Sequence, residues 1–204
     1  MTLALIDYGA GNLHSVENAL KAAGASNILV TAHPEDVRNA DRIVLPGVGA
    51  FAACMGALAA VPGMVDVLNE RVIGGGVPFL GVCVGMQLMA QAGEEFGTHP
   101  GLGWISGTVA RLEPDDPAAR VPHMGWNDVV PVVPHALILP GEAYFLHSFA
   151  FQTADPATLA ATTDHGGIVT AAVARDNLIG VQFHPEKSQA YGLAFLARFL
   201  DWRP

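Results

Sequence analysis

The chain has 204 residues, of which 51% are hydrophobic and 14% are charged, and its formal net charge is -9. This length and composition predict one folded domain over residues 1–204 and exclude a disordered or fibrous protein. The negative net charge argues against nucleic acid and anionic membranes as partners.

The N-terminal stretch has no basic leader and meets Asp7 in its first apolar run, which is not the pattern of a signal peptide. The best apolar stretch is interrupted by Pro62, Gly63 and Asp66. It therefore falls short of the roughly 18–20 residues that a membrane span needs. We expect a cytoplasmic protein.

The first half of the sequence alternates short apolar runs with helix-like segments. We expect strands at 3–7, 27–32, 42–47 and 78–83. We expect helices at 12–24, 34–39, 50–60 and 64–73, and another that starts near Met86. This alternation is typical of a parallel sheet covered by helices on both faces.

Prolines divide the second half into shorter β-like pieces, which we expect at 108–112, 126–133 and 143–151. A hairpin turning at Asp176-Asn177 follows, and a helix over 190–202 ends the chain, with Leu193, Leu196, Phe199 and Leu200 on one face. The expected fold class is α/β: a single domain with a central, mostly parallel sheet flanked by helices, plus an antiparallel β portion in the second half.

Cys83 stands in the pattern G-V-C-V-G, where an expected strand runs into an expected helix. Glycines on both sides of a nucleophile relieve crowding at a sharp strand–helix turn, and the backbone N–H of Val84 would then point toward an oxyanion. A core thiol at a tight turn fits the same pattern, so this motif alone leaves both interpretations open. Cys54 has no such turn, and we expect it to be a buried structural cysteine. Two cysteines are too few for a disulfide framework or a four-cysteine zinc site.

His184 and Glu186 follow the last expected strand in the stretch "GVQFHPEKSQ". Pro185 favours an extended conformation at His184, and in an extended chain residues two apart point to the same side. Glu186 can then orient the imidazole of His184 as a catalytic base. A strand-end histidine beside a solvated glutamate is the alternative. The other histidines are expected to be scattered singly, and no ligand cluster indicates a metal site.

The stretch "LPGVGAF" (45–51) is a glycine-rich turn after an expected strand. Its backbone N–H groups can supply a second oxyanion donor, although a plain strand–helix connector would show the same composition. The stretch "DYGAGNLH" (7–14) has His14 where a dinucleotide-binding motif needs a third glycine, so we expect no such cofactor there.

Together these motifs resemble those of the class I glutamine amidotransferases. "GVCVGMQ" is similar to the nucleophile motif of that family, "FHPE" to its His–Glu motif, and the resemblance covers nearly the whole chain. It implies a Cys83–His184–Glu186 triad that hydrolyses glutamine through a cysteine thioester, without cofactor or metal. It also implies oxyanion contacts from the backbone of Val48, Gly49 and Val84. The glutamine-binding residues that it implies are Gln87, Glu95 (with Glu94 as a neighbouring possibility), Ser148 and Phe149, the last in place of the usual tyrosine.

Within the family, "DYGAGN", "LPGVGAF", "PHMGWN" and the pair "FLHSF"/"HPEKSQ" are most similar to the branch that serves histidine biosynthesis. The glutaminase of that branch works beside a (β/α)8-barrel cyclase, which binds a phosphorylated substrate and receives the ammonia. The resemblance makes Asn12, Trp126 and Lys187 candidates for the contact face. A glutaminase for another synthase, such as the pyridoxal phosphate branch, and an inactive regulatory relative are the alternatives.

Overall fold

A computed structural model describes residues 1–204. Its main sheet has nine strands in the order β2-β1-β3-β4-β13-β12-β11-β8-β9. The parallel strands are β2 (Ile28–Thr31), β1 (Leu3–Ile6), β3 (Arg42–Gly47), β4 (Phe79–Cys83) and β13 (Leu178–Val181). The antiparallel strands are β12 (Ile168–Arg175), β11 (Leu159–Asp164), β8 (His123–Pro131) and β9 (Gly141–His147). This mixed sheet confirms the expected α/β class.

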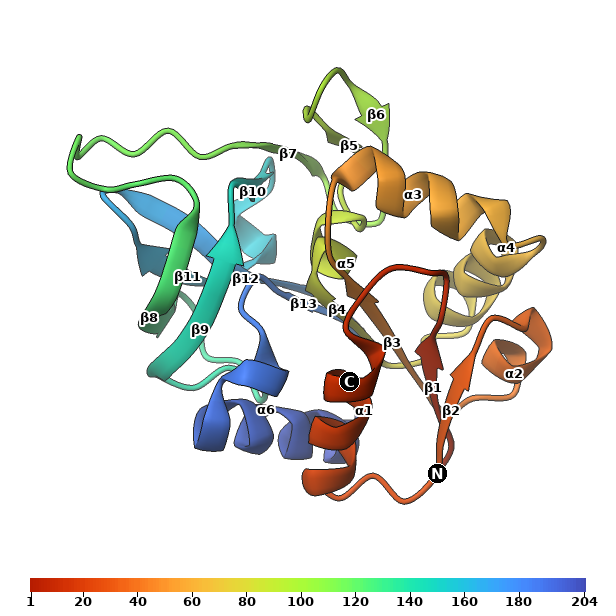
Figure 1. The fold of residues 1–204 in the computed structure, drawn as a ribbon. Coiled ribbons are helices and arrows are strands. Elements are labelled where there is room, and N and C mark those ends of the chain that lie inside the picture. The colour runs from red at the N-terminus through yellow and green to blue at the C-terminus, as the bar shows by residue number, and fades with distance from the viewer.

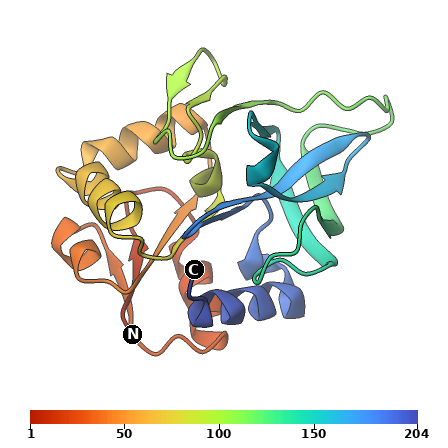
Figure 2. The same cartoon turned by 180° about the vertical axis from the view of Figure 1, so that it is seen from behind.

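Helices cover both faces of the parallel strands (Figures 1 and 2). Helices α1 (Leu13–Ala22) and α6 (Gln189–Asp201) pack together on one side, and α3 (Phe51–Ala60) and α4 (Met64–Leu68) lie on the other. The short helix α2 (Pro34–Arg38) packs against α4, which continues into a π-helical turn over Asn69–Gly74. Every residue of β1, β3 and β4 is buried, as two covered faces require.

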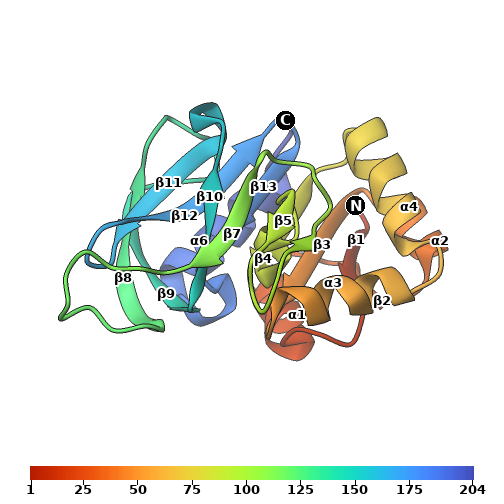
Figure 3. The same ribbon diagram turned by 90° about the horizontal axis from the view of Figure 1, so that it is seen from above.

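A second sheet has the order β10-β7-β5-β6 and lies over the main sheet in the view from above (Figure 3). Its strands are β10 (Phe149–Thr153), β7 (Gly107–Arg111), β5 (Ala92–Gly93) and β6 (His99–Pro100). Two 3₁₀ turns, Pro156–Thr158 and Pro185–Lys187, complete the regular structure. Phe149 and Arg111 of the small sheet line a pocket together with Cys83, the last residue of β4.

Three local expectations differ from the structure. The helix expected from Met86 is a single turn, α5 (Val84–Gln87), after which the chain turns into β5. The piece expected at 143–151 is broken at Ser148, because His147 pairs with β8 whereas Phe149 pairs with β7 of the other sheet. Leu193 is 36% exposed beside the groove between α1 and α6, while Leu196, Phe199 and Leu200 are buried as expected.

No single helix is long and apolar enough to cross a membrane. The pair Phe51–Ala60 and Met64–Gly74, bent by 95°, passes that test by length and composition only.

Candidate active site

Cys83 ends β4 at the sharp turn into α5. Its φ of 54° and ψ of -114° are rare for a residue with a side chain and store backbone strain. Both flanking positions require glycine, because backbone atoms of neighbouring residues lie where a Cβ would stand. A Cβ at Gly81 would lie 2.6 Å from the Gly85 carbonyl oxygen, and a Cβ at Gly85 would lie 1.9 Å from the Leu45 carbonyl oxygen. The turn expected from G-V-C-V-G is therefore present, although α5 is too short to give the helix dipole that a longer helix would supply.

One pocket collects the chemistry-bearing residues at the carboxyl ends of β3, β4 and β13. This is the edge where open parallel sheets assemble their sites. Of the residues singled out in the sequence, ten line it: Val48, Gly49, Cys83, Val84, Gln87, Glu95, Ser148, Phe149, His184 and Lys187. Asn12 and Trp126 do not, and Glu186 lies behind His184.

Glu186 holds His184 by a short contact between Oε1 and the imidazole Nδ1, at 2.8 Å. Both side chains are almost fully buried, and the amide of His184 donates to the Tyr144 carbonyl at 2.9 Å. His184 itself is extended, as expected, with φ -100° and ψ 98°, but the two residues after it are not. Strand β13 ends at Val181, and Pro185 opens a 3₁₀ turn that brings Glu186 back to the ring. Nδ1 is thus occupied by Glu186, which leaves Nε2 as the nitrogen that can act in the pocket lined by His184 and Cys83.

The pKa of His184 is set by burial and by its two partners. Burial alone lowers the pKa, but hydrogen bonds and charge interactions with Cys83 and Glu186 outweigh it and raise the pKa to about 10. The other carboxylate oxygen of Glu186, Oε2, is buried without a hydrogen-bond partner, so its charge is balanced mainly by the imidazole. A protonated imidazole next to a sulfur favours the thiolate, which is the nucleophilic form of cysteine.

Val48, Gly49 and Val84 line the same pocket from two loops, and their backbone N–H groups are candidates for an oxyanion site. Val84 is the first residue of α5, where an amide has no intrahelical acceptor, and neither the Val48 nor the Gly49 amide donates a hydrogen bond within the chain. The thiol of Cys54, buried as expected, donates to the Val48 carbonyl at 3.3 Å. Since a trans peptide points its C=O and N–H in opposite directions, this bond turns the Gly49 N–H away from Cys54.

Gln87 connects the small sheet to the nucleophile. Its side-chain nitrogen donates to the Phe149 carbonyl and to Gln182 Oε1, each at 3.0 Å, and the Gln182 amide lies 3.6 Å from Cys83 Sγ. Both N–H groups of Gln87 are thus used inside the protein, which leaves its Oε1 for a ligand. Gln182 is fully buried and was missed in the sequence, where only its place two residues before His184 marks it.

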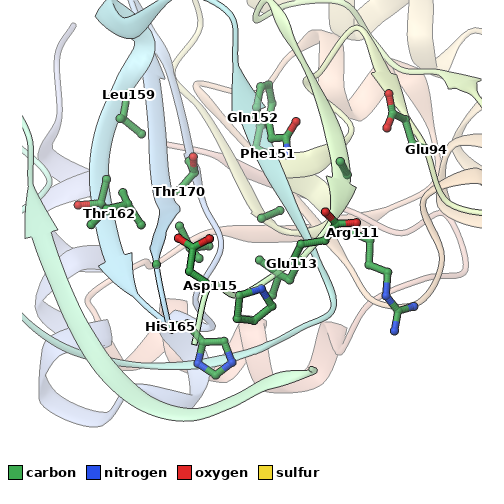
Figure 4. A pocket seen from close by; sticks show the side chains of 17 residues that line it. Glu94, Arg111, Glu113, Asp115, Phe151, Gln152, Leu159, Thr162, His165 and Thr170 are labelled. Atoms are coloured by element: carbon green, nitrogen blue, oxygen red, sulfur yellow. The ribbon is translucent and has the colours of Figure 1, made fainter. Parts of the chain in front are cut away.

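Glu95 and Glu94 fall in different pockets, which separates two possibilities that the sequence left open. Glu95 lines the Cys83 pocket, and its Oε2 accepts from the Phe51 amide at the start of α3. Glu94 lines a second pocket between β7, β10 and the antiparallel strands, together with Glu113 and Asp115 (Figure 4). No cysteine lines that second pocket.

Arg111 is a second residue that the sequence did not reveal. It ends β7, directly opposite Phe149 in the strand pairing, and lines the Cys83 pocket. Figure 4 shows its guanidinium group extending away from Asp115 and His165. With Glu95 and Lys187, it gives the pocket one acidic and two basic side chains besides His184.

The three expected contact residues have different surroundings. The Asn12 side chain accepts from the Ser15 amide and caps α1, which gives it a structural role as well. Trp126 is half exposed and packs edge-on against Tyr144 at 6.3 Å. Lys187 places its Nζ 5.8 Å from the centre of the same tyrosine ring.

The sequence suggested that the other histidines are scattered singly, but three of them lie together in the structure. His123, His147 and His165 form one cluster, because β8, β9 and the turn after β11 bring together residues far apart in the sequence. No group of three or more His, Cys, Asp or Glu side chains in the structure is arranged to hold a metal ion.

A mixed α/β sheet with a strained cysteine and a His–Glu pair at its carboxyl edge is the arrangement of a cysteine-dependent amidase. The sequence matches the family "Glutamine amidotransferase class-I" over residues 4–201, and the chain belongs to that family. It is 64% identical over 206 residues to the imidazole glycerol phosphate synthase subunit HisH of Zymomonas mobilis subsp. mobilis, covering 100% of this chain and 97% of that protein. It is 55% identical over 212 residues to the subunit of the same name from Caulobacter vibrioides, covering 100% and 99%.

Among solved structures, one titled "Crystal structure of glutamine amidotransferase" superposes with a TM-score of 0.77 and covers 98% of both chains. Its sequence identity is 17%, so this likeness concerns the fold alone.

Proposed function

We propose that this chain is the glutaminase subunit of imidazole glycerol phosphate synthase. It hydrolyses glutamine and passes the ammonia to a cyclase subunit, which makes imidazole glycerol phosphate and aminoimidazole carboxamide ribonucleotide. The observation that carries the proposal is a strained Cys83 that shares a pocket with His184, which is hydrogen-bonded to Glu186. The full-length identity to proteins with the name HisH supports the choice of synthase.

The proposed reaction has two steps. The Cys83 thiolate attacks the side-chain amide carbon of glutamine, and the oxyanion is held by N–H groups of Val48 or Gly49 and Val84. The C–N bond breaks as His184 gives a proton to the leaving ammonia, which leaves a γ-glutamyl thioester. His184 then takes a proton from water as that water attacks the thioester, releasing glutamate and the free cysteine. Glu186 orients the ring in both steps, and the reaction needs no cofactor or metal.

The pocket suits a substrate that carries both charges of a free amino acid. Glu95 matches an α-ammonium group, whereas Arg111 and the Phe149 amide match an α-carboxylate. Gln87 Oε1 is placed to accept from the amide that reacts. These side chains distinguish glutamine from a glutamine side chain within a peptide, which lacks both charges.

Exposed apolar side chains beside the pocket support a partner face on β8 and β9. Met124 and Trp126 of β8 lie opposite Leu146 and Tyr144 of β9, and Met124, Trp126 and Leu146 are exposed. We call these four residues the β8–β9 apolar patch. Exposed apolar patches of this kind mark interaction sites, and Leu146 and Lys187 belong to the pocket as well. A (β/α)8-barrel cyclase docked here, with Asn12 also in the contact face, would receive ammonia without release to solvent.

We further propose that residues 1–204 form one domain and that the protein works in the cytoplasm. The sheet supports the first point, because the parallel strands of the first half and the antiparallel strands of the second half share one hydrogen-bonded ladder.

The test is reconstitution with the cyclase subunit. The chain and the cyclase should co-purify, and the complex should release glutamate from glutamine in the presence of the cyclase substrate. Glutamine-dependent product with a pyridoxal phosphate synthase, and none with the cyclase, would overturn the choice of synthase.

A further inference from the structure

A series of hydrogen bonds crosses the antiparallel half of the molecule and ends at the substrate pocket. Asn127 Nδ2 lies 3.0 Å from His123 Nε2, His123 Nδ1 lies 3.0 Å from His147 Nε2, and His147 Nδ1 lies 2.9 Å from the Phe149 carbonyl oxygen. His123 and His147 face each other as the paired end residues of β8 and β9. Both are buried.

The two ends of the series fix every proton in it. The Phe149 carbonyl only accepts, so His147 carries its proton on Nδ1 and leaves Nε2 as an acceptor. His123 must then donate from Nδ1, which leaves its own Nε2 to accept from Asn127. The second N–H of Asn127 donates to the Asp164 carbonyl at 2.7 Å, and its Oδ1 accepts from the Asp128 amide at 2.9 Å. Both histidines are therefore neutral Nδ1–H tautomers.

The cluster has no place for an added proton. A proton on Nε2 of either ring would point at a neighbouring donor. Burial, together with the neighbouring histidines, lowers the pKa of His123 to about 3. Burial also lowers the pKa of His147, to about 4, in spite of its bond to Phe149. The His123 ring is further held by stacking between Phe145 and His165, at centroid distances of 4.7 and 4.1 Å.

The Phe149 carbonyl is the point where this series meets the substrate pocket. It accepts from His147 and from Gln87, which uses both of its lone pairs. The neighbouring bond from the Leu112 amide to the Ser148 carbonyl shows that Phe149 occupies a position where N–H and C=O point away from β7. The Phe149 N–H thus shares its direction with a carbonyl that the histidines hold in place.

We propose that His123 and His147 are positioning residues for glutamine: through the Phe149 carbonyl they orient the Phe149 N–H that receives the substrate carboxylate. The inference rests on the proposed function. Neither residue touches the reacting atoms, so their loss is expected to weaken substrate binding more than the chemical steps.

The kinetic test uses matched variants in the complex with the cyclase. His123→Phe keeps a stacked ring but removes the donor to His147, and we expect KM for glutamine to rise roughly tenfold with kcat within about twofold of wild type. His123→Asn keeps an N–H near the Nδ1 position and should restore part of the affinity. His165→Phe keeps the stacking and breaks none of the series, so its KM should be unchanged.

A wild-type KM in His123→Phe, or an equal rise in His165→Phe, would overturn the inference. A wild type that hydrolyses no glutamine would instead refute the proposed function.

A spectroscopic test is independent of activity and of the folding of any variant. Long-range ¹H–¹⁵N spectra of the ¹⁵N-histidine-labelled wild-type complex should show His123 and His147 as Nδ1–H tautomers at pH 7. An Nε2–H tautomer or an imidazolium at either residue would contradict the series of hydrogen bonds.

Discussion

His184 is buried, yet it holds its proton to a pKa of about 10, because the favourable effects of Cys83 and Glu186 exceed the cost of burying its charge. The Oε2 atom of Glu186 is buried without a hydrogen-bond partner. Because an unpaired buried carboxylate costs free energy, the charge on Glu186 depends on its pairing with His184. At the scale of single residues, Cys83, His184 and Glu186 therefore form one coupled unit, in which the loss of any side chain affects the other two.

Replacing Glu186 with Gln tests that unit. The amide keeps the size of the side chain but removes the negative charge, so the pKa of His184 should fall below about 10. We expect kcat for glutamine to drop roughly 10²- to 10⁴-fold, with a smaller change in KM. An NMR titration of His184 and steady-state kinetics measure the two effects. An unchanged His184 titration would show that Glu186 does not carry the charge assigned to it.

At the scale of elements, the turn from β4 into α5 depends on glycines at close approach. An alanine Cβ at position 85 would lie 1.9 Å from the Leu45 carbonyl oxygen, a backbone atom of β3 that cannot move aside. The same turn sets the φ of Cys83. The close packing of this turn therefore also determines how the thiol is presented to the pocket.

We expect Gly85→Ala to lower the free energy of unfolding by about 3 kcal/mol or more. Gly56 is the matched control, because it lies within α3 and an added Cβ would contact nothing within 4 Å. Gly56→Ala should raise the free energy of unfolding by about 0.5–1 kcal/mol through helix propensity. Urea unfolding compares the two, and equal effects would refute the role assigned to the close approach.

The pairing of β8 with β9 predicts a loss of stability in acid. His123 and His147 titrate at about 3 and about 4 in the folded protein, whereas an unfolded histidine titrates near 6.5. The unfolded state therefore binds more protons below pH 6.5, and stability falls as pH drops from 6.5 toward 4, by up to about 1.4 kcal/mol per pH unit for each histidine.

Urea unfolding at pH 7, 6 and 5 measures this loss. In His123→Phe the decline between pH 6.5 and 5 should be shallower than in the wild type. An identical decline in the two proteins would place the acid sensitivity elsewhere.

Most helices and strands can be predicted from local patterns in the sequence, whereas the candidate site can be predicted only in part. Continuous apolar runs and the G-V-C-V-G motif predict β3, β4 and the turn at Cys83, because their causes are local. The break at Ser148, the bond from Gln182 toward Cys83, and the meeting of His123 with His147 depend on which strands pair. Pairing across more than 20 residues leaves no local pattern, so the histidine cluster could not be predicted.

At the scale of the whole molecule, the β8–β9 apolar patch and the Cys83 pocket adjoin each other, because β9 supplies residues to both. The opposite face of β8 carries His123 and Asn127, since successive residues of a strand point to opposite sides. One strand thus serves the proposed partner face on one side and the glutamine site on the other.

Removing the largest side chain of the patch should weaken the complex with the cyclase. We expect Trp126→Ser to raise the dissociation constant roughly 30-fold, because a buried tryptophan at an interface is commonly worth about 2 kcal/mol or more. Ile168, which is 77% exposed away from the patch, is the control, and Ile168→Ser should leave the constant unchanged. Calorimetric titration measures both dissociation constants. Equal affinities for the two variants would show that Trp126 of β8 does not contribute to the contact face.

The central claim is that Cys83 releases ammonia from glutamine for use by the cyclase. The most direct measurement is formation of imidazole glycerol phosphate by the complex, with either glutamine or ammonium salt as the nitrogen source, in the wild type and in Cys83→Ala. We expect Cys83→Ala to lose glutamine-driven synthesis by roughly 10⁴-fold or more, and to keep ammonium-driven synthesis at the wild-type rate. Glutamine-driven synthesis that survives in Cys83→Ala would contradict the account.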